Sequence, residues 1–195
     1  RERLLAVRGM HGPDAVGVYG GGSLTNESAY LLGKFARIAL RTRYIDYNGR
    51  FCMSAAASAG VKTFGIDRGL TNRLSEIPQA ECIILAGTNI AECQPTLMPY
   101  FTKAKENGAR IIVIDPRTTG TAALADLHLR VRPGTDAALA NGLLKVVFEE
   151  GLTDEAFIRQ RTTGFEELRE HVSKLDLEEI AELTGVAAAD IRRAA

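Results

Sequence analysis

The spacing of apolar residues predicts an α/β organisation for most of the chain. Two short β-branched runs, Cys82–Ala86 (CIILA) and Arg110–Ile114 (RIIVI), have the composition of strands that are buried on both faces of a parallel sheet. Between them, residues 95–107 have helical spacing and end before Gly108, a residue type that commonly follows a helix end. This order predicts a right-handed strand, helix, strand crossover.

The same alternation is predicted on either side of this unit. Residues 15–19 (AVGVY) have the pattern of a strand that runs into three glycines, and residues 26–40 show the apolar recurrence of a helix. A further strand is expected at residues 127–131, followed by a turn and an amphipathic helix that extends to about Glu150. The predicted fold class is therefore α/β, with a doubly wound, mainly parallel, Rossmann-like sheet of roughly four strands.

The pattern changes near residue 150. From Gly151 onward the chain consists of charged helical segments separated by Gly and Thr, and no further strand is predicted. We expect an α/β domain over residues 1–150 and a helical extension or subdomain over residues 151–195. Because the sequence starts at Arg1 and begins within a helical pattern, we also expect it to be an internal segment of a longer protein.

Composition excludes several classes of function. The 195 residues include 24 Lys plus Arg and 24 Asp plus Glu, so no broad positive field is available to hold nucleic acid or an anionic membrane. No apolar run reaches the roughly 20 residues of a membrane helix, and the first residues lack the plan of a signal peptide. We therefore expect a soluble, intracellular protein without a nucleic-acid or membrane partner; a cytoplasmic location is implied only by the family resemblance of YIDYNGRFCMS that is described below. The three cysteines form no CxxC pair, which argues against a disulfide framework and an all-cysteine zinc site.

Polar loops follow the two apolar strands at their carboxyl ends, where open α/β sheets bind their ligands. The first loop contains Gly87, Thr88 and Asn89, with Glu92 shortly after, and the second contains Asp115, Pro116, Arg117, Thr118 and Thr119. An Asp after a strand commonly binds ribose hydroxyls, and a neighbouring Arg or Thr binds phosphate, so the two loops predict a nucleotide crevice. The alternative for each loop taken alone is a capped turn without a ligand.

A third turn offers the same two interpretations. Gly134 permits a close approach of the backbone, and either Thr135 or Asp136 has the side chain to cap the helix that follows. Alternatively, the two carboxylate oxygens of Asp136 accept hydrogen bonds from the ring NH and amino group of guanine, a pairing that adenine cannot supply. The local sequence leaves both interpretations open.

Cys52 has the setting of a reactive or metal-binding thiol. It lies in a predicted turn that leads into a helix of small residues from Ser54, and Arg50 is nearby; a helix N-terminus and a cation both lower the pKa of a thiol. Cys82, by contrast, is expected to be a small core residue of its strand. No histidine has the setting of a partner for a cysteine hydrolase, and a single thiolate suffices for a metal only when a cofactor supplies the other ligands.

Several separated segments together resemble the catalytic subunit of molybdopterin-dependent oxidoreductases of the dimethyl sulfoxide reductase superfamily. The resemblance runs from about His11 to the C-terminus, and the segments that carry it are YGGGS, IDYNGRFCMSAAA, AGTNIAECQP, IDPRTT, LAD and PGTDAAL, in this order. Within the superfamily the sequence is most similar to the assimilatory or cytoplasmic nitrate reductases.

The glycines of YGGGS match neither the dinucleotide fingerprint nor the P-loop pattern.

The resemblance implies a molybdenum ion held by two molybdopterin guanine dinucleotides, with the thiolate of Cys52 as the protein ligand. It also implies that Ser23 and Asn48 contact the cofactor, and that the loop from Ala86 to Cys93 contacts its pterin and phosphate groups. Residues 115–119 and 134–136 match the two segments that bind a guanosine end. The cysteine cluster that holds a 4Fe-4S centre in the family, a nearby Lys and the later domains are not part of this sequence, so we expect the isolated chain to be inactive, with weak affinity for guanine nucleotides.

Met53 follows the proposed metal ligand, as it does in nitrate reductases, whereas formate dehydrogenases usually carry His there. The resemblance thus implies two-electron reduction of nitrate to nitrite, with electrons from a donor protein or domain. Two alternatives remain. One is formate dehydrogenase or another oxidoreductase of the superfamily, such as one that acts on thiosulfate or polysulfide. The other is a nucleotide-binding module without catalysis, in which Cys52 is structural.

Overall fold

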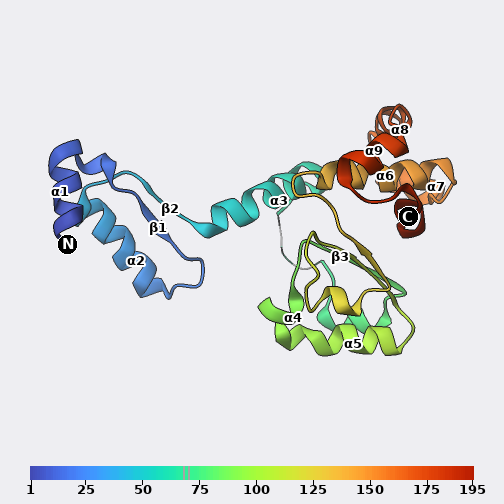
Figure 1. Cartoon of the computed structure of the whole chain (residues 1–195), viewed down its shortest axis with the longest axis horizontal. Coiled ribbons are helices and arrows are strands. Elements are labelled where there is room, and N and C mark those ends of the chain that lie inside the picture. Colours follow the sequence, from blue (N-terminus) through green and yellow to red (C-terminus); the bar gives the residue numbers. More distant parts are fainter. Residues whose placement is uncertain (68, 70) are drawn as a thin grey trace. The chain divides into compact units, whose positions relative to one another are not determined.

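The chain forms two compact units in the computed structural model, which describes residues 1–67, 69 and 71–195 (Figure 1). The first unit comprises Arg1–Thr71 and the second comprises Asn72–Ala195. Within the described part of the chain, no helix combines the length and the apolar character that crossing a membrane requires.

The first unit is built around a two-stranded parallel sheet. In chain order it contains α1 (Glu2–His11), a 3-10 turn (Pro13–Ala15), β1 (Val18–Gly20), α2 (Asn26–Lys34), a π-helical segment (Phe35–Leu40), β2 (Ile45–Tyr47) and α3 (Asn48–Phe64). The predicted strand at 15–19 is present but lies closer to the glycines, and the predicted helix at 26–40 is divided into α2 and the π-helical segment. The Thr25 side chain accepts a hydrogen bond from the Ser28 amide and caps α2.

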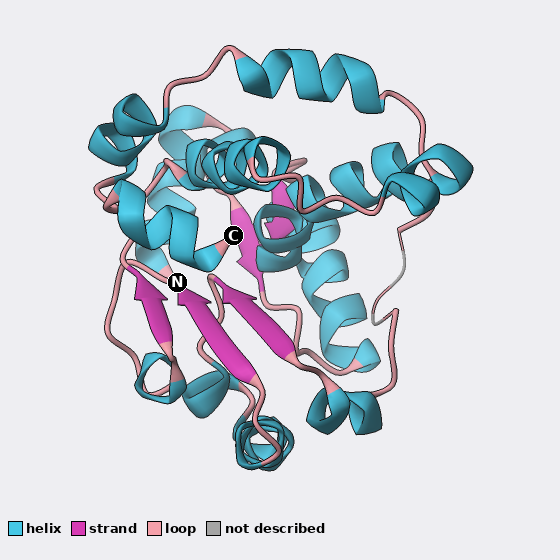
Figure 2. Ribbon diagram, turned by 90° about the vertical axis from the view of Figure 1, so that its right-hand side faces the viewer, coloured by secondary structure: helices cyan, strands magenta, loops and turns pink. Residues whose placement is uncertain are grey.

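The second unit contains a three-stranded parallel sheet in the order β3-β4-β5, seen with its strands side by side in Figure 2. Its first half comprises a 3-10 segment (Leu74–Gln79), β3 (Cys82–Ala86), α4 (Ile90–Cys93), a 3-10 turn (Pro95–Leu97), α5 (Met98–Glu106) and β4 (Arg110–Ile114). Its second half comprises a 3-10 turn (Ala122–Leu124), β5 (Leu127–Leu129), α6 (Asp136–Glu149), α7 (Glu155–Arg161), α8 (Phe165–Ser173), α9 (Leu177–Thr184) and α10 (Ala188–Ala194).

Helices cover both faces of the central strand β4. Ile111 and Val113 pack into one core with Phe101 of α5, whereas Ile112 and Ile114 point into a second core on the opposite face. The second core includes Leu139 and Val146 of α6 together with Leu177, Ile180 and Ile191 of the following helices. The α/β class with parallel strands and a helical C-terminal part is therefore confirmed. The domain boundary at residue 150 stays a prediction, and the helices on both sides of it share this core.

Two features of the sheets differ from the prediction. The strands do not form one sheet of roughly four, because β1 pairs with β2, a strand of three residues that the sequence pattern did not predict. The expectation that Cys82–Ala86 is buried on both faces, with Cys82 in the core, was also wrong: Cys82 is exposed and Ile84 is 55% exposed. The physical reason is that β3 lies at the edge of the sheet, while the core around α6, α9 and α10 covers β4 and β5.

Asp126 anchors the start of β4. One of its carboxylate oxygens accepts a hydrogen bond from the Ile111 amide at 2.8 Å, and the other lies 3.8 Å from both Lys105 and Arg110. The hydrogen bond from Ile111, aided by these two cations, lowers the pKa of Asp126 against the smaller opposing effect of its partial burial.

Replacing Asp126 with Ala should lower the free energy of unfolding at pH 7 by about 1 to 2 kcal/mol, because the Ile111 amide loses a charged acceptor. Since the folded-state pKa is lowered, the carboxylate contributes its full stability above the ordinary Asp pKa of about 3.9 and loses it as the pH falls through the folded value. The difference between wild type and variant in urea unfolding should therefore shrink from pH 7 to pH 3. A constant difference across this range would contradict the charged role of Asp126.

Candidate functional site

The loops after β3 and β4 lie against each other, as the sequence predicted from the two consecutive strand ends. Gly87, the first residue after β3, has a φ of 62° and donates its amide hydrogen to the carbonyl of Ile114, the last residue of β4, at 2.8 Å. The positive φ favours glycine at this position. The two polar loops therefore begin from neighbouring points on one edge of the sheet.

The loop after β4 is held by its own side chains. Asp115 is buried, and its carboxylate accepts a hydrogen bond from the Arg117 amide at 2.7 Å. On the other side, His128 of β5 donates from Nε2 to the Asp115 carbonyl at 2.8 Å, and Thr119 accepts from the Ala122 amide at 3.2 Å. Three side chains of this loop remain exposed: Pro116, Arg117 and Thr118. The loop thus presents a guanidinium and a hydroxyl on a fixed backbone.

The loop after β3 is tied to the same segment by Asn89. The Asn89 side chain is buried and accepts a hydrogen bond from the hydroxyl of Thr121, which is completely buried, at 3.2 Å. Thr88 is half-buried, and Gly87 and Glu92 are exposed. The structure therefore brings the predicted residues of these two loops together in the second unit.

The turn before α6 follows the carboxyl end of β5, on the same edge of the parallel sheet. Gly134 has a φ of 87°, and the Thr135 hydroxyl donates to the Arg132 carbonyl at 2.7 Å. No side chain caps α6, so the interpretation of Thr135 or Asp136 as a plain helix cap is wrong. Asp136 is exposed in the first helical turn, where the helix dipole favours a negative charge.

The predicted cofactor residues of the first unit lie around the glycine loop. A cavity of about 480 Å³ is lined by Gly20, Gly21 and Gly22 on one side and by Asp46, Tyr47 and Arg50 on the other. The Asn48 side chain accepts a hydrogen bond from the Gly22 amide at 2.6 Å and so joins the glycine loop to the start of α3. Ser23 follows Gly22 and is exposed, as is Asn48.

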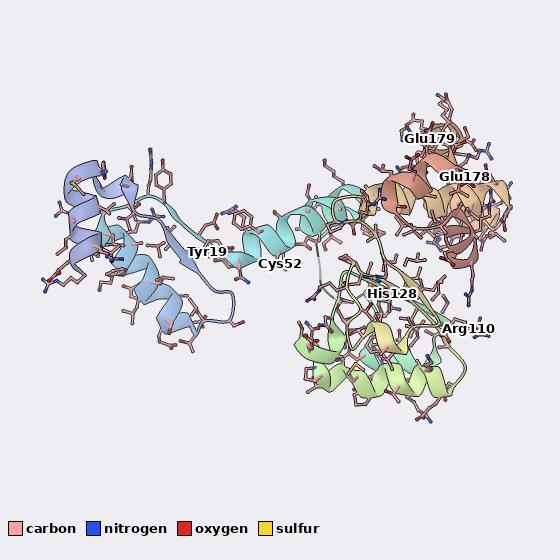
Figure 3. The ribbon with its side chains drawn as sticks, viewed as in Figure 1. Tyr19, Cys52, Arg110, His128, Glu178 and Glu179 are labelled. Atoms are coloured by element: carbon pink, nitrogen blue, oxygen red, sulfur yellow. The ribbon has the colours of Figure 1, made fainter. Side chains whose placement is uncertain are left out.

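Cys52 lies near the beginning of α3 with an exposed side chain (Figure 3). The helix begins at Asn48 rather than at Ser54, so Cys52 is already helical and the predicted turn around it was wrong. Arg50 of α3 forms an ion pair with Asp46 of β2, so its guanidinium already has a carboxylate partner. Met53 is 51% exposed.

No group of three or more His, Cys, Asp or Glu side chains that could hold a metal occurs among the residues that the structure describes. An exposed thiol without protein co-ligands fits a metal whose remaining ligands come from a cofactor, because thiolate is a soft ligand. The backbone around it also fits a large cofactor, since the neighbouring cavity has a wall of three glycines.

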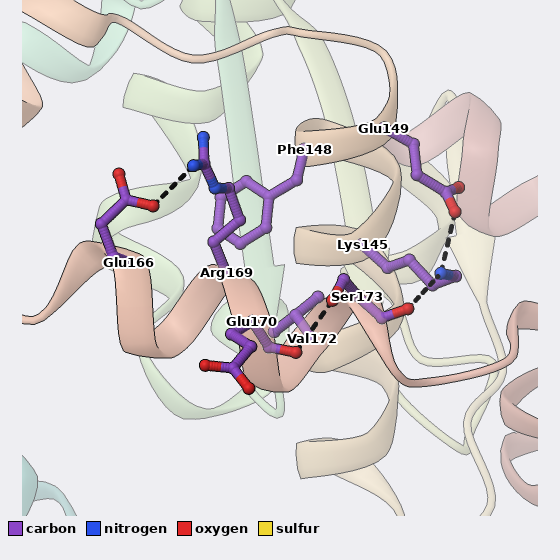
Figure 4. A pocket seen from close by; sticks show the side chains of 8 residues that line it. All are labelled: Lys145, Phe148, Glu149, Glu166, Arg169, Glu170, Val172 and Ser173. Carbon is purple, nitrogen blue, oxygen red and sulfur yellow. Dashed lines mark hydrogen bonds and ion pairs between the residues drawn. The ribbon is translucent and has the colours of Figure 1, made fainter.

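A further cavity, in the second unit, contains none of the predicted site residues. It measures about 620 Å³ and lies between α6 and α8, over Phe148 and Val172 (Figure 4). Its charged side chains are all paired: Lys145 lies 2.8 Å from Glu149, Arg169 lies 2.5 Å from Glu166, and Glu170 lies 2.7 Å from Lys174 outside the cavity. These pairs leave the cavity without an unpaired cation or carboxylate aimed at a ligand.

Two residues that organise the sheet edge were not predicted from the sequence. Thr121 joins the two loops, and His128 binds the backbone of Asp115. The available signal for Thr121 was a single hydroxyl within the apolar turn TAALA, directly after the polar loop. For His128 the signal was a polar residue at the middle of a three-residue strand next to the Asp loop.

Comparisons with known proteins agree on one family. Residues 1–188 match the family described as Molybdopterin oxidoreductase. The chain is 64% identical over 195 residues to the assimilatory nitrate reductase catalytic subunit of Bacillus subtilis (strain 168). This alignment covers 100% of the chain and 28% of the relative. It is 40% identical over 186 residues to the F420-dependent formate dehydrogenase 2 subunit alpha of Methanococcus maripaludis, or 95% of the chain and 27% of the relative.

A solved structure has a similar fold. Acetylene hydratase from Pelobacter acetylenicus matches with a TM-score of 0.64 and 30% sequence identity, over 99% of this chain and 26% of that chain. The chain thus spans little more than a quarter of the length of the relatives it matches.

Proposed function

The chain belongs to the molybdopterin oxidoreductase family, and from this we propose that it is part of the catalytic subunit of a cytoplasmic, assimilatory nitrate reductase. The observation that carries the proposal is the 64% identity, across all 195 residues, to a protein named for that activity. The formate dehydrogenase relative is 40% identical over a similar length. Met53 beside Cys52 supports nitrate over formate, as the sequence resemblance implied.

Cys52 is proposed as the protein ligand of molybdenum. Its thiol is exposed near the start of α3, and the described residues around it supply no rival ligand cluster. When bound, molybdenum with two molybdopterin guanine dinucleotides supplies a centre that accepts and donates two electrons. Met53 follows Cys52 directly, and we assign it a role at the substrate.

The remaining predicted residues are proposed to bind the dinucleotides. In the first unit, Ser23 and Asn48 contact the cofactor beside the glycine-walled cavity. In the second unit, three loops at one edge of the sheet bind phosphate, pterin and guanosine groups. Their residues are Gly87, Thr88, Asn89 and Glu92 after β3, Asp115, Pro116, Arg117, Thr118 and Thr119 after β4, and Gly134, Thr135 and Asp136 after β5.

Two features of the second unit support this assignment. The guanidinium of Arg117 forms no hydrogen bond or ion pair with another side chain that the structure describes, and the same holds for the carboxylate of Asp136. A free guanidinium suits a phosphate, and a free carboxylate suits the donor edge of guanine. The capped turn without a ligand accounts for the hydrogen bonds of Asp115 and Thr119, but not for the unpaired guanidinium of Arg117.

The proposed reaction combines nitrate, two electrons and two protons to give nitrite and water. The electrons come from a donor protein or domain, through a 4Fe-4S cluster that is bound outside this chain. Nitrate is the only small-molecule substrate that the proposal includes, and neither nucleic acid nor a membrane is a partner.

The test is an assay of the complete subunit with reduced viologen as electron donor. We expect nitrate to oxidise the dye and formate to give no turnover in the reverse assay with oxidised dye. Formate oxidation without nitrate reduction would instead assign the protein to the formate dehydrogenases. A purified subunit without molybdenum and without either activity would favour the nucleotide-binding module.

A further inference from the structure

One buried hydroxyl joins the loops after β3 and β4. Thr121 is completely buried, and its Oγ1 donates a hydrogen bond to Asn89 Oδ1 at 3.2 Å while it accepts one from the Ala91 amide at 3.0 Å. Asn89 ends the loop after β3 and Ala91 lies at the start of α4, both about 30 residues earlier in the chain. A single side-chain oxygen thus uses a donor and an acceptor function to bridge two segments.

The bridge replaces the ordinary cap of α4. The first amides of a helix have no partner within it, and the residue before the helix commonly provides one from its side chain. Asn89 occupies that position in α4 but makes no capping hydrogen bond, because its side-chain oxygen is bound to Thr121. Thr121 supplies the missing acceptor to Ala91 from the opposite loop. The start of α4 therefore depends on the loop after β4.

The backbones around this bridge are closely packed. A Cβ atom on Gly120 would lie only 3.1 Å from the Cβ atom of Ala91, a separation tighter than most real contacts. Ile90 and Ala122, the neighbours of the bridged residues, are buried in the same core beneath the sheet. The two loops are therefore closely packed and are joined by both hydrogen bonds of Thr121.

We propose that Thr121 is a positioning residue of the nucleotide site: it fixes the loop after β3 against the loop after β4, so that both are ordered before the ligand binds. The inference rests on the proposed function, in which these loops bind the guanine dinucleotide. Thr121 itself is buried and touches no ligand. Its effect on binding arises because an ordered site loses less conformational freedom when a ligand binds.

The experiment is a titration of the isotope-labelled full chain with GDP, followed by the amide signals of both loops in NMR spectra. Thr121→Val has nearly the same shape but loses both hydrogen bonds, whereas Thr121→Ser keeps the hydroxyl. We expect GDP to shift signals in both loops of the wild type, with a dissociation constant in the millimolar range and weaker binding of ADP. Thr121→Val should weaken GDP binding about tenfold and accelerate hydrogen exchange at Ala91, and Thr121→Ser should restore both to within about twofold.

Thr184→Val is the matched control, because Thr184 is also completely buried and its hydroxyl both donates, to the carbonyls of Ile180 and Ala181, and accepts, from the Val186 amide. These partners lie within α9 and the residues that follow it. This variant tests whether the loss of any buried hydroxyl in the second unit weakens binding. If Thr184→Val and Thr121→Val lose the same GDP affinity, Thr121 has only a general structural role and the proposal is overturned.

The remaining outcomes separate the two proposals. If the wild type binds GDP and Thr121→Val binds it equally well, the positioning role is refuted while the nucleotide site stands. If the wild type shows no shift at GDP concentrations of about 10 mM, the nucleotide site itself is refuted and the positioning role falls with it. Binding by Thr121→Ser as weak as that of Thr121→Val would also contradict the role of the hydroxyl.

Discussion

Replacing Cys52 with Ala in the complete subunit should remove most of its molybdenum and lower nitrate reduction at least about 100-fold. Changing a residue that only supports a metal ligand already costs about 10- to 100-fold in affinity or activity, and Cys52 is proposed as the ligand itself. The fold should tolerate the change, because the side chain is exposed on α3 and Ala is the best helix former. The free energy of unfolding should therefore change by no more than about 0.5 kcal/mol.

Three measurements check this expectation: the molybdenum content by mass spectrometry, the rate of nitrate-dependent dye oxidation, and the unfolding curve in urea. The matched control is Cys82→Ala, because Cys82 is also an exposed thiol but belongs to β3 of the second unit, outside the sequence segment that is proposed to bind the metal. The control should keep its metal and its rate. Retention of both by Cys52→Ala would refute the ligand assignment, and equal losses in the two variants would point to general thiol damage.

The parts of the fold that the sequence predicted best are those with a strong local pattern. The runs CIILA and RIIVI became β3 and β4 at the predicted bounds, since four or five consecutive apolar residues between polar turns specify a strand. The helices after Gly151 were also predicted well, because Asp154 and Asp176 cap α7 and α9 and Gly185 ends α9.

The parts that were missed depend on tertiary contacts. Strand β2 has only three residues, too few for a period of two to be distinguished, and it is defined by pairing with β1. The exposure of Cys82 and Ile84 could not be predicted, because an apolar run shows that a strand can be buried but not which helices cover it. The start of α3 was misplaced because Asn48 and Gly49 are typical turn residues, although both are helical here.

In the candidate site, too, the features with a local sequence pattern were predicted and those that depend on tertiary contacts were not. The loops at the strand ends followed from the position of GTN and DPR after apolar runs, because parallel strands place their carboxyl ends on one edge. Hydrogen bonds between residues 30 apart, such as that from the Ala91 amide to Thr121, leave no signal in a single sequence. A local pattern thus predicts where ligand groups gather, whereas the contacts that hold them in place emerge only in three dimensions.

Replacing Leu139 should strongly destabilise the core between the sheet and the C-terminal helices. This side chain is 1% exposed on α6 and belongs to the cluster that includes Ile112 of β4 and Leu177, Ile180 and Ile191 of the last helices. Leu139→Ala removes buried apolar atoms and leaves a cavity in contact with both layers, which should lower the free energy of unfolding by about 2 to 5 kcal/mol. That is a large share of the roughly 5 to 15 kcal/mol that stabilises a typical domain.

Urea unfolding of the full chain, followed by the loss of helical circular dichroism, measures this effect. The control is Leu183→Ala on α9, because Leu183 is also a helical leucine but is 54% exposed. Its replacement should lower the free energy of unfolding by at most about 1 kcal/mol. A loss in Leu139→Ala that is no larger than that of the control would mean that α6 does not share a core with the helices after residue 150. A large and selective loss would instead establish that these helices, predicted as an extension, are part of the stabilising core of the second unit.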